Sequence, residues 1–142
     1  MSADENKAIA HRWYEMLNSH NLTRMDELFA ADFVDHNPAV LNHDLDGTKQ
    51  LFSMYLDAFP DVQVTVEDLI AEGDRVAARF TARGTHKGPF MELRPTGKPI
   101  TLTAIDILRI AGGRIVEHWG EMDTLGLMQQ LGAIPAPGQP GA

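Results

Sequence analysis

The first part of the chain carries apolar residues at helical spacing. A capping-box pair, Ser2 and Glu5, precedes a run that ends where residues 18–21 become polar. Thr23 is placed to cap a short second helix that extends to Phe29. These signals predict two helices in succession.

An extended segment and a third helix are predicted next. Residues 31–38 leave the second helix in an extended form, because Pro38 disfavours helical backbone in the residue before it. From Asp46 or Thr48 onward, apolar side chains again recur on one side until Pro60 ends the helix. Three helices therefore precede the rest of the chain.

Beyond the third helix the period changes to two, which is typical of β-strands. Residues 62–67 and 76–83 alternate apolar and polar side chains around a Gly73-Asp74 turn, which predicts an antiparallel hairpin. A loop over 84–99, a strand over 100–110, a strand over 114–122 and a short helix over 125–131 follow. Helices followed by such a sheet predict an α+β fold, in which the helices cover one face of the sheet.

The composition agrees with one domain. With 142 residues and 44% hydrophobic content, the chain has apolar material for a single core, which we place at residues 1–134. Residues 135–142 are rich in Pro and Gly and predict a flexible tail. No apolar run is long enough to span a bilayer, and the acidic start does not resemble a signal peptide, so we expect a cytoplasmic protein.

Charge and motifs exclude several classes of partner. The net charge of −8 and the scattered Lys and Arg residues argue against nucleic acid. No Walker-type or GxGxxG loop supports a nucleotide cofactor, and the histidines form no HxH or HExxH pair, so we expect neither cofactor nor metal. The absence of cysteine excludes a thiol nucleophile. A small, neutral or weakly charged ligand remains.

Asp106 is a candidate for the chemistry. It lies on the predicted strand 100–110 in phase with Ile100, Leu102, Ala104 and Leu108, so a carboxyl group is expected to face the core. A buried carboxylate is costly unless it is hydrogen-bonded or protonated, and a buried carboxyl is suited to general acid catalysis. The alternative is that Asp106 marks a bulge or a subunit interface.

The last strand presents two polar sets of opposite phase. Trp119 shares one phase with Asp123, and His118 lies in the other. A register change at Gly120 would merge the two sets. His118 is then a candidate base or hydrogen-bond donor, oriented by a nearby carboxylate, although a histidine with only structural hydrogen bonds is an equal alternative.

Other residues are candidates for binding a substrate. Asn37 is expected at the pocket rim, where it would donate to a substrate carbonyl, unless it only forms an Asx turn. Tyr14 lies beside the apolar face of the first helix and offers a phenol, unless it is simply core. His86 lies in a loop that can close over a ligand. The full set of binding candidates is Tyr14, His36, Asn37, Phe59, His86 and Trp119.

The order of elements and several local strings resemble the SnoaL-like polyketide cyclases, a branch of the nuclear-transport-factor-2-like, or cone-shaped α+β barrel, superfamily. The likeness extends to about Ala133. It is carried by the strings at 33–38, 59–61, 73–77, 84–86, 95–98 and 114–119, followed by Asp123 and Leu125-Gly126. Each string is weak alone, but together and in this order they are specific.

The resemblance implies a cone-shaped barrel, a dimer or tetramer built through the sheets, and a metal-free acid/base cyclase. The reaction would be an intramolecular aldol condensation of a polyketide-like ester. It also implies an acid/base carboxylate late in the chain, for which Asp123 is the first candidate. Some relatives carry this acid directly after the Trp, where the chain has Gly120.

Three alternatives remain open beside the cyclase. The same cavity can serve a non-catalytic domain that binds a small apolar ligand. The fold also carries hydrolases and isomerases of small metabolites. Related ketosteroid isomerases place their catalytic Asp just before such a Pro, where this chain has Asn37, so that particular reaction is disfavoured.

Overall fold

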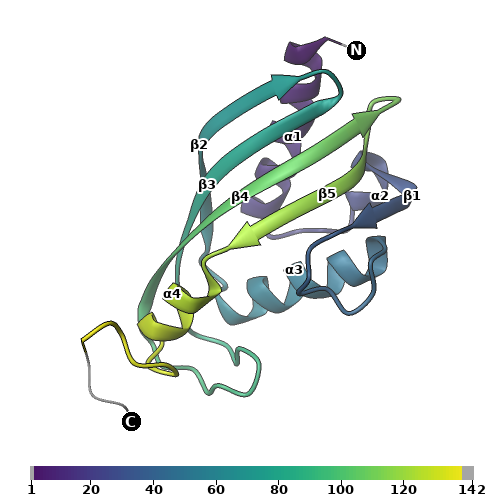
Figure 1. Cartoon of the computed structure of the whole chain (residues 1–142). Helices are drawn as coiled ribbons and strands as arrows, with labels where there is room; N and C mark the ends of the chain where they lie inside the picture. Colours follow the sequence, from purple (N-terminus) through teal and green to yellow (C-terminus); the bar gives the residue numbers. More distant parts are fainter. Residues whose placement is uncertain (1, 139–142) are drawn as a thin grey trace.

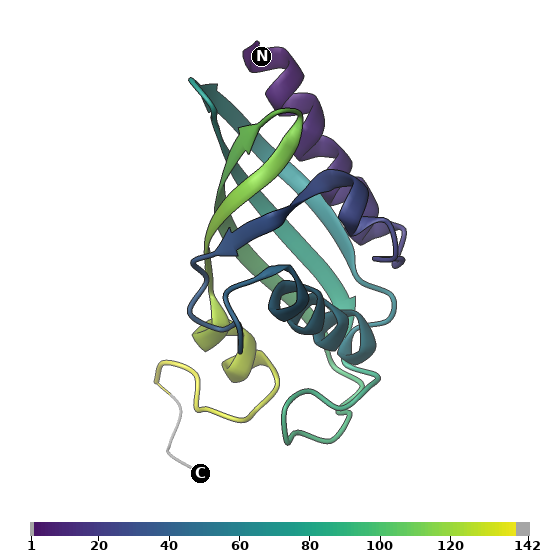
Figure 2. The ribbon, with the colours of Figure 1, turned by 90° about the vertical axis from the view of Figure 1, so that its right-hand side faces the viewer.

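Helices and strands occupy most of residues 2–138, the part of the chain that the computed structural model describes. In chain order the elements are α1 (Ala3–Asn18), α2 (Met25–Leu28), β1 (Phe29–Asp35), α3 (Leu45–Ala58), β2 (Gln63–Glu72), β3 (Arg75–Thr85), β4 (Pro99–Ala111), β5 (Arg114–Met122) and α4 (Thr124–Gln130). The strands form one curved sheet in the order β1-β5-β4-β3-β2, with α1 and α3 on one of its sides (Figure 1, Figure 2). The predicted α+β fold is confirmed.

The helices begin and end close to the predicted positions. Ser2 and Glu5 form the reciprocal capping box of α1. The second helix is shorter than predicted, because Arg24 is its N-cap and Phe29 already belongs to β1. In α3 the side chain of Asp44 accepts a hydrogen bond from the backbone N–H of Gly47, so that helix begins slightly before the predicted position.

The extended segment after α2 is a strand of the sheet. β1 pairs in parallel with β5 and forms one edge of the sheet, whereas all other neighbouring strands are antiparallel. The sequence predicts the extended backbone but not this pairing, because the partner strand lies about eighty residues further along the chain.

The register change in β5 lies at Val116 and not at Gly120. Arg109 pairs with Glu117 and Ile110 pairs with Ile115, so Val116 is the extra residue of a bulge. The bulge shifts the phase of the strand. Ile115 and His118 are three residues apart, yet both are buried.

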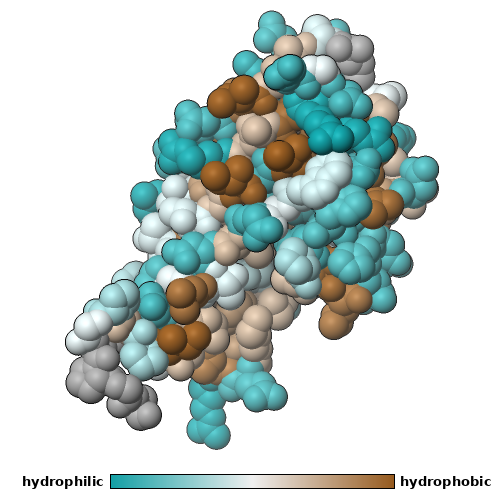
Figure 3. All heavy atoms as spheres, in the orientation of Figure 1, coloured by the Kyte–Doolittle hydropathy of each residue, from teal (hydrophilic) through white to brown (hydrophobic). Residues whose placement is uncertain are grey.

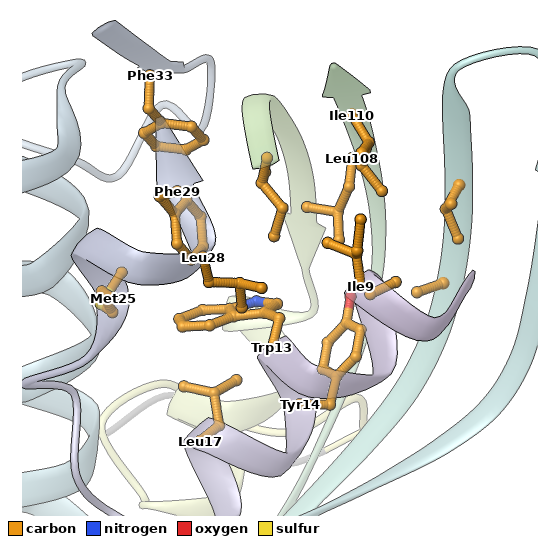
Figure 4. Close-up of a cluster of buried hydrophobic side chains, with 14 of the residues drawn as sticks. Ile9, Trp13, Tyr14, Leu17, Met25, Leu28, Phe29, Phe33, Leu108 and Ile110 are labelled. Carbon is orange, nitrogen blue, oxygen red and sulfur yellow. The ribbon is translucent and has the colours of Figure 1, made fainter. Parts of the chain in front are cut away.

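A large apolar cluster between α1, α2 and the sheet forms the core. Trp13 packs edge-on against Phe29 and Phe52, with ring centroids 4.9 and 5.1 Å apart. Figure 4 shows Trp13 and Tyr14 projecting from α1 among Leu28, Phe29 and Leu108. The core thus brings the inner side of β4 and β5 against α1.

Two further sequence predictions concern a membrane span and the C-terminal tail. No helix among residues 2–138 is long and apolar enough to cross a membrane. Of the predicted tail, residues 139–142 lie outside the described part of the chain, as does residue 1 of the predicted domain.

Candidate active site

Four buried polar side chains from four different elements meet on the inner face of the sheet, the face that α1 covers. They are Tyr14 of α1, Asp35 of β1, Asp106 of β4 and His118 of β5, and each is at most 3% exposed. We refer to these four residues as the buried polar network. Two carboxyl groups and an imidazole so deep in a small domain are costly to bury without partners, so their hydrogen bonds decide whether the arrangement is stable.

Strand periodicity positions the network. On β4 every second residue from Ile100 to Ile110 is buried, which includes Asp106 and confirms that its side chain faces the core. Asp35 follows Phe33 at the same period on β1. The bulge at Val116 brings His118 to this inner face, and the sheet order then places β5 between β1 and β4.

His118 bridges the two carboxyl groups. Its Nδ1 lies 2.9 Å from Oδ1 of Asp35, and its Nε2 lies 2.9 Å from Oδ1 of Asp106. The hydroxyl of Tyr14 donates to Oδ2 of Asp106 over 2.8 Å. Since a carboxylate only accepts hydrogen bonds, both ring nitrogens of His118 act as donors, which is the pattern of a charged imidazolium.

The charges of the network shift the proton affinities of its members. Burial lowers the pKa of His118, but the charges and hydrogen bonds of Asp106 and Asp35 outweigh burial and raise the pKa to about 10. Burial raises the pKa of Asp35, but its contacts with His118 and Thr48 and the backbone of Asn37 hold it below the ordinary value. Burial, followed by the charge of Asp106, raises the pKa of Tyr14 well above its ordinary value. The structure therefore holds His118 as a charged hydrogen-bond donor at neutral pH.

The two carboxylates differ in how fully they are hydrogen-bonded. Oδ1 of Asp35 also accepts from the backbone N–H of Asn37 at 2.9 Å, and its Oδ2 accepts from the Thr48 hydroxyl at 2.6 Å. Within residues 2–138, Asp35 thus receives three hydrogen bonds and Asp106 receives two. Asp106 keeps more lone pairs free for a further hydrogen-bond donor, and Asp35 is the more fully hydrogen-bonded partner of His118.

Sequence reasoning missed Asp35 and Thr48. The signal for Asp35 was present, because Phe33 and Asp35 share the phase that identified Asp106 on its own strand. The segment is short and ends at Asn37-Pro38, so the sequence predicts extended backbone there but assigns it no partner strand and no inner face. Thr48 carries no comparable signal, since a hydroxyl in the first turn of a helix is common.

The absence of a side chain at Gly120 leaves room for the buried polar network. It pairs with Asp106 across β4 and β5, and a Cβ added there would lie 2.8 Å from Oδ1 of Asp106 and from Nε2 of His118. The carboxyl group of Asp106 thus occupies the space into which a side chain at position 120 would project. In this chain the acidic group at that place comes from the neighbouring strand.

An apolar cavity of about 50 Å³ lies next to the network, and we call it the inner cavity. Its lining comes from α1, α3, the turn between α3 and β2, and the sheet, and consists of Leu17, Phe52, Tyr55, Leu56, Phe59, Val62, Val64, Phe80, Ala82, Ile100, Leu102 and Met122. Phe80 also packs against Tyr14, with ring centroids 5.3 Å apart. Of the predicted binding residues, Phe59 lines the cavity. Tyr14 does not line it but packs against Phe80, which does.

His36 and Trp119 lie on the outer face of the sheet, the face turned away from α1 and α3. Their rings stack with centroids 4.8 Å apart, and the guanidinium of Arg75 lies 4.9 Å from the Trp119 ring. His36 and Arg109 both contact the carboxylate of Glu117. The structure therefore gathers these two predicted binding residues into a separate outer cluster, away from the inner cavity.

Two further candidates, Asn37 and Asp123, have local roles in the structure. Oδ1 of Asn37 accepts from the backbone N–H of Ala39, which is the Asx turn that the sequence left open. Asp123 is exposed and is the N-cap of α4, where its side chain accepts from the N–H of Gly126. Asp123 thus lies outside the buried polar network.

His86 is buried in the loop before β4. Its Nδ1 accepts from the backbone N–H of Thr96 at 3.1 Å, and its ring lies 5.6 Å from that of Phe59. Its Nε2 has no hydrogen-bond partner among the described residues. Because Nδ1 accepts, Nε2 carries the proton, so His86 presents a buried N–H donor beside a residue that lines the inner cavity.

Metal binding has no geometric support in the described part of the chain. Within residues 2–138, no group of three or more His, Asp or Glu side chains is arranged to hold a metal ion. Both ring nitrogens of His118 already contact carboxylates.

Comparison with known proteins agrees with the fold. The family model described as SnoaL-like polyketide cyclase matches residues 7–131. The chain therefore belongs to the SnoaL-like polyketide cyclase family. No curated protein matches the chain.

Several solved structures share the fold over nearly the whole chain. AclR from Streptomyces galilaeus, provisionally described as a hydroxylase, is 32% identical with a TM-score of 0.88, over 95% of this chain and 85% of AclR. IdmH from Streptomyces antibioticus, provisionally described as a polyketide cyclase, is 37% identical with a TM-score of 0.80, over 89% of this chain and 98% of IdmH. TsrD from Streptomyces laurentii is 28% identical with a TM-score of 0.84, over 94% of this chain and 99% of TsrD.

Proposed function

We propose that the protein is a cofactor-free acid/base enzyme that closes a ring in a polyketide-like ester by an intramolecular aldol-type cyclisation, with the substrate held in the inner cavity beside the buried polar network. The observation that carries this proposal is His118, held between two buried carboxylates of which Asp106 also contacts Tyr14. Strongly coupled, buried titratable groups beside an apolar cavity are typical of acid/base sites. Membership of the SnoaL-like cyclase family supports the same class of reaction.

Asp106 is the acid/base group in this proposal. Its carboxylate takes a proton from an activated C–H that lies between two carbonyl groups of the substrate. The resulting enolate carbon forms a C–C bond with another carbonyl carbon of the same molecule, and the new alkoxide takes the proton back from Asp106. Proton and charge are thus balanced over one cycle without a cofactor.

The other members of the network assist Asp106. The imidazolium of His118 stays protonated through the cycle and stabilises the carboxylate form of Asp106. Asp35 fixes the ring of His118, and the Tyr14 hydroxyl contacts Asp106 on the side of Phe80. Ala104 pairs with Phe80 and with Met122, so the two cavity-lining residues flank a small side chain two positions before Asp106 on β4.

Binding without catalysis is the second candidate function. It is favoured by one observation: the inner cavity is lined by apolar and aromatic residues, and no member of the network is part of that lining. A domain that only held an apolar ligand would need no more than this.

Turnover separates the two functions. The full chain is incubated with a panel of linear polyketide esters, aromatic β-keto esters, Δ5-ketosteroids and epoxides, and products are identified by chromatography and mass spectrometry. The cyclase proposal predicts a cyclised product of unchanged mass from an ester substrate, lost in Asp106→Asn. Binding of these compounds with no enzyme-dependent product from any of them would establish the binding function instead.

A further inference from the structure

A second apolar depression adjoins the inner cavity, and we propose that it is the outer half of the substrate site. It would take a neutral, apolar portion of the substrate that lies away from the reacting carbonyls. This inference rests on the proposed function only in assuming that the inner cavity holds the reacting part of the ligand.

This depression, which we call the outer hollow, has a volume of about 250 Å³. It lies between α3, the segment that precedes α3, the loop before β4, and α4, and its lining is Ala39, Leu41, Gly47, Gln50, Leu51, Met54, Tyr55, Met91 and Thr124. None of these residues is charged, although the chain has 12 basic and 20 acidic residues. The lining therefore suits a neutral ligand.

Size indicates that the inner cavity alone is not the whole site. Small-molecule sites usually enclose about 300–1,000 Å³, and the inner cavity provides only about 50 Å³. The volumes of the inner cavity and the outer hollow together reach the lower end of that range. An extended substrate would thus use both compartments.

Tyr55 stands at the boundary between them, because it is part of both linings. Its ring packs against Phe90 and Phe59, with centroids 5.3 and 6.3 Å apart, and its hydroxyl is hydrogen-bonded to the Thr124 side chain. These contacts define where the ring lies. Tyr55 is therefore the residue that sets how far a ligand extends from one compartment into the other.

The rim of the outer hollow exposes apolar side chains that a ligand would cover. Leu41 is 85% exposed and Met91 is 59% exposed. Covering such surface is favourable, and none of the residues that line the outer hollow lies on a strand of the sheet. Both side chains are thus accessible to substitution without loss of core packing.

The walls of the outer hollow are preformed. A Cβ on Gly47 would lie only 1.8 Å from the carbonyl oxygen of Asn42, so the segment before α3 packs directly on the helix. On the other wall, Phe90 and Leu93 exchange backbone hydrogen bonds of 3.0 and 2.8 Å around Met91. A preformed wall lowers the cost of ordering on binding.

Ligand binding by rim variants tests this inference. The probe is Prodan, a neutral naphthyl ketone dye whose emission moves to shorter wavelength in apolar surroundings, titrated into the full chain. A charge on the rim should weaken binding, so Leu41→Glu and Met91→Glu should each raise the Kd about tenfold or more. The matched control is Leu125→Glu, which changes an exposed apolar residue of α4 outside the hollow and should leave the Kd within about twofold of wild type.

Binding and turnover distinguish this inference from the proposed function. Asp106→Asn should lower turnover by about 10²–10⁴, whereas Leu41→Glu and Met91→Glu should weaken Prodan binding whether or not Asp106 is the acid/base group. Tyr55→Ala should allow a longer naphthyl ketone to bind at least as tightly as Prodan, and Tyr55→Phe should not. The inference is overturned if wild type does not bind Prodan, or if the two rim variants bind it as well as wild type.

Discussion

Oδ1 of Asp35 lies 2.9 Å from Nδ1 of His118, although 83 residues separate the two along the chain. The contact exists because β1 pairs in parallel with β5 and places Asp35 level with His118. It makes Asp35 a positioning residue for an imidazolium that in turn contacts Asp106.

Replacement of Asp35 should loosen His118. Asp35→Asn removes the negative charge and leaves the imidazolium with one carboxylate, so we expect a loss of about 1.5–3 kcal/mol in the free energy of unfolding. Urea unfolding near pH 7 measures this loss. Asp32→Asn, an exposed change on the same strand, is the control and should have almost no effect. Equal stability of the two variants would show that the Asp35 contact contributes nothing.

The raised pKa of His118 predicts a pH-dependent stability. The folded protein keeps the proton on His118 up to about pH 10, whereas the unfolded chain loses it near 6.5. The contribution is complete below pH 6.5 and falls as the pH rises toward 10, by at most about 1.4 kcal/mol per pH unit. Urea unfolding at several pH values measures it, and His118→Gln should show a flatter decline over this range. Parallel curves for the two proteins would contradict the charged state of His118.

Gly120 should not tolerate a side chain. In Gly120→Ala the new methyl group would collide with the Asp106 carboxyl and the His118 ring, so we expect a destabilisation of about 1–3 kcal/mol. Thermal unfolding provides the measurement. In an Asp106→Ala background one of the two collisions is absent, and the cost of Gly120→Ala should be smaller. If Gly120→Ala destabilises the Asp106→Ala variant as much as it destabilises the wild type, the Asp106 carboxyl is not what the new methyl group collides with.

The outer face of the sheet predicts self-association. Ile70, Ile105 and Ile107 are exposed there, and Figure 3 shows hydrophobic residues among hydrophilic ones on this face. We expect a homodimer or homotetramer by light scattering at micromolar concentration, and Ile105→Glu should dissociate it. Leu125→Glu, which lies off the sheet, should leave it intact. A monomeric wild-type protein would contradict this prediction.

The sequence predicts those parts of the structure that depend on local pattern. Strand period alone indicated the inward direction of Asp106, and the Ser2–Glu5 pair indicated the start of α1. The phase of β5 depends on a bulge at Val116, which is set by pairing with β4 and has no clear sequence signal. For that reason the inner side of β5 was ambiguous, and Trp119 was expected at the cavity.

The sequence contains a local signal for the role of Asp123, its helix N-cap position, that the sequence analysis did not use. An Asp directly before residues 124–130 has the position of a helix N-cap, and its side chain makes that bond to Gly126. The family resemblance favoured it as the acid/base group. The structure instead brings Asp106, His118 and Asp35 together, since only pairing between distant strands can do so.

The most direct test of the account compares turnover by Asp106→Asn with turnover by Asp123→Asn on an ester that the wild-type protein cyclises. Both changes keep side-chain size and remove proton exchange, and thermal unfolding of each verifies that the fold is retained. If Asp106 is the acid/base group, Asp106→Asn should lower kcat by about 10²–10⁴, whereas Asp123→Asn should remain within about twofold of wild type. Full turnover by Asp106→Asn, with loss of turnover in Asp123→Asn, would contradict the assignment of the chemistry to the buried polar network.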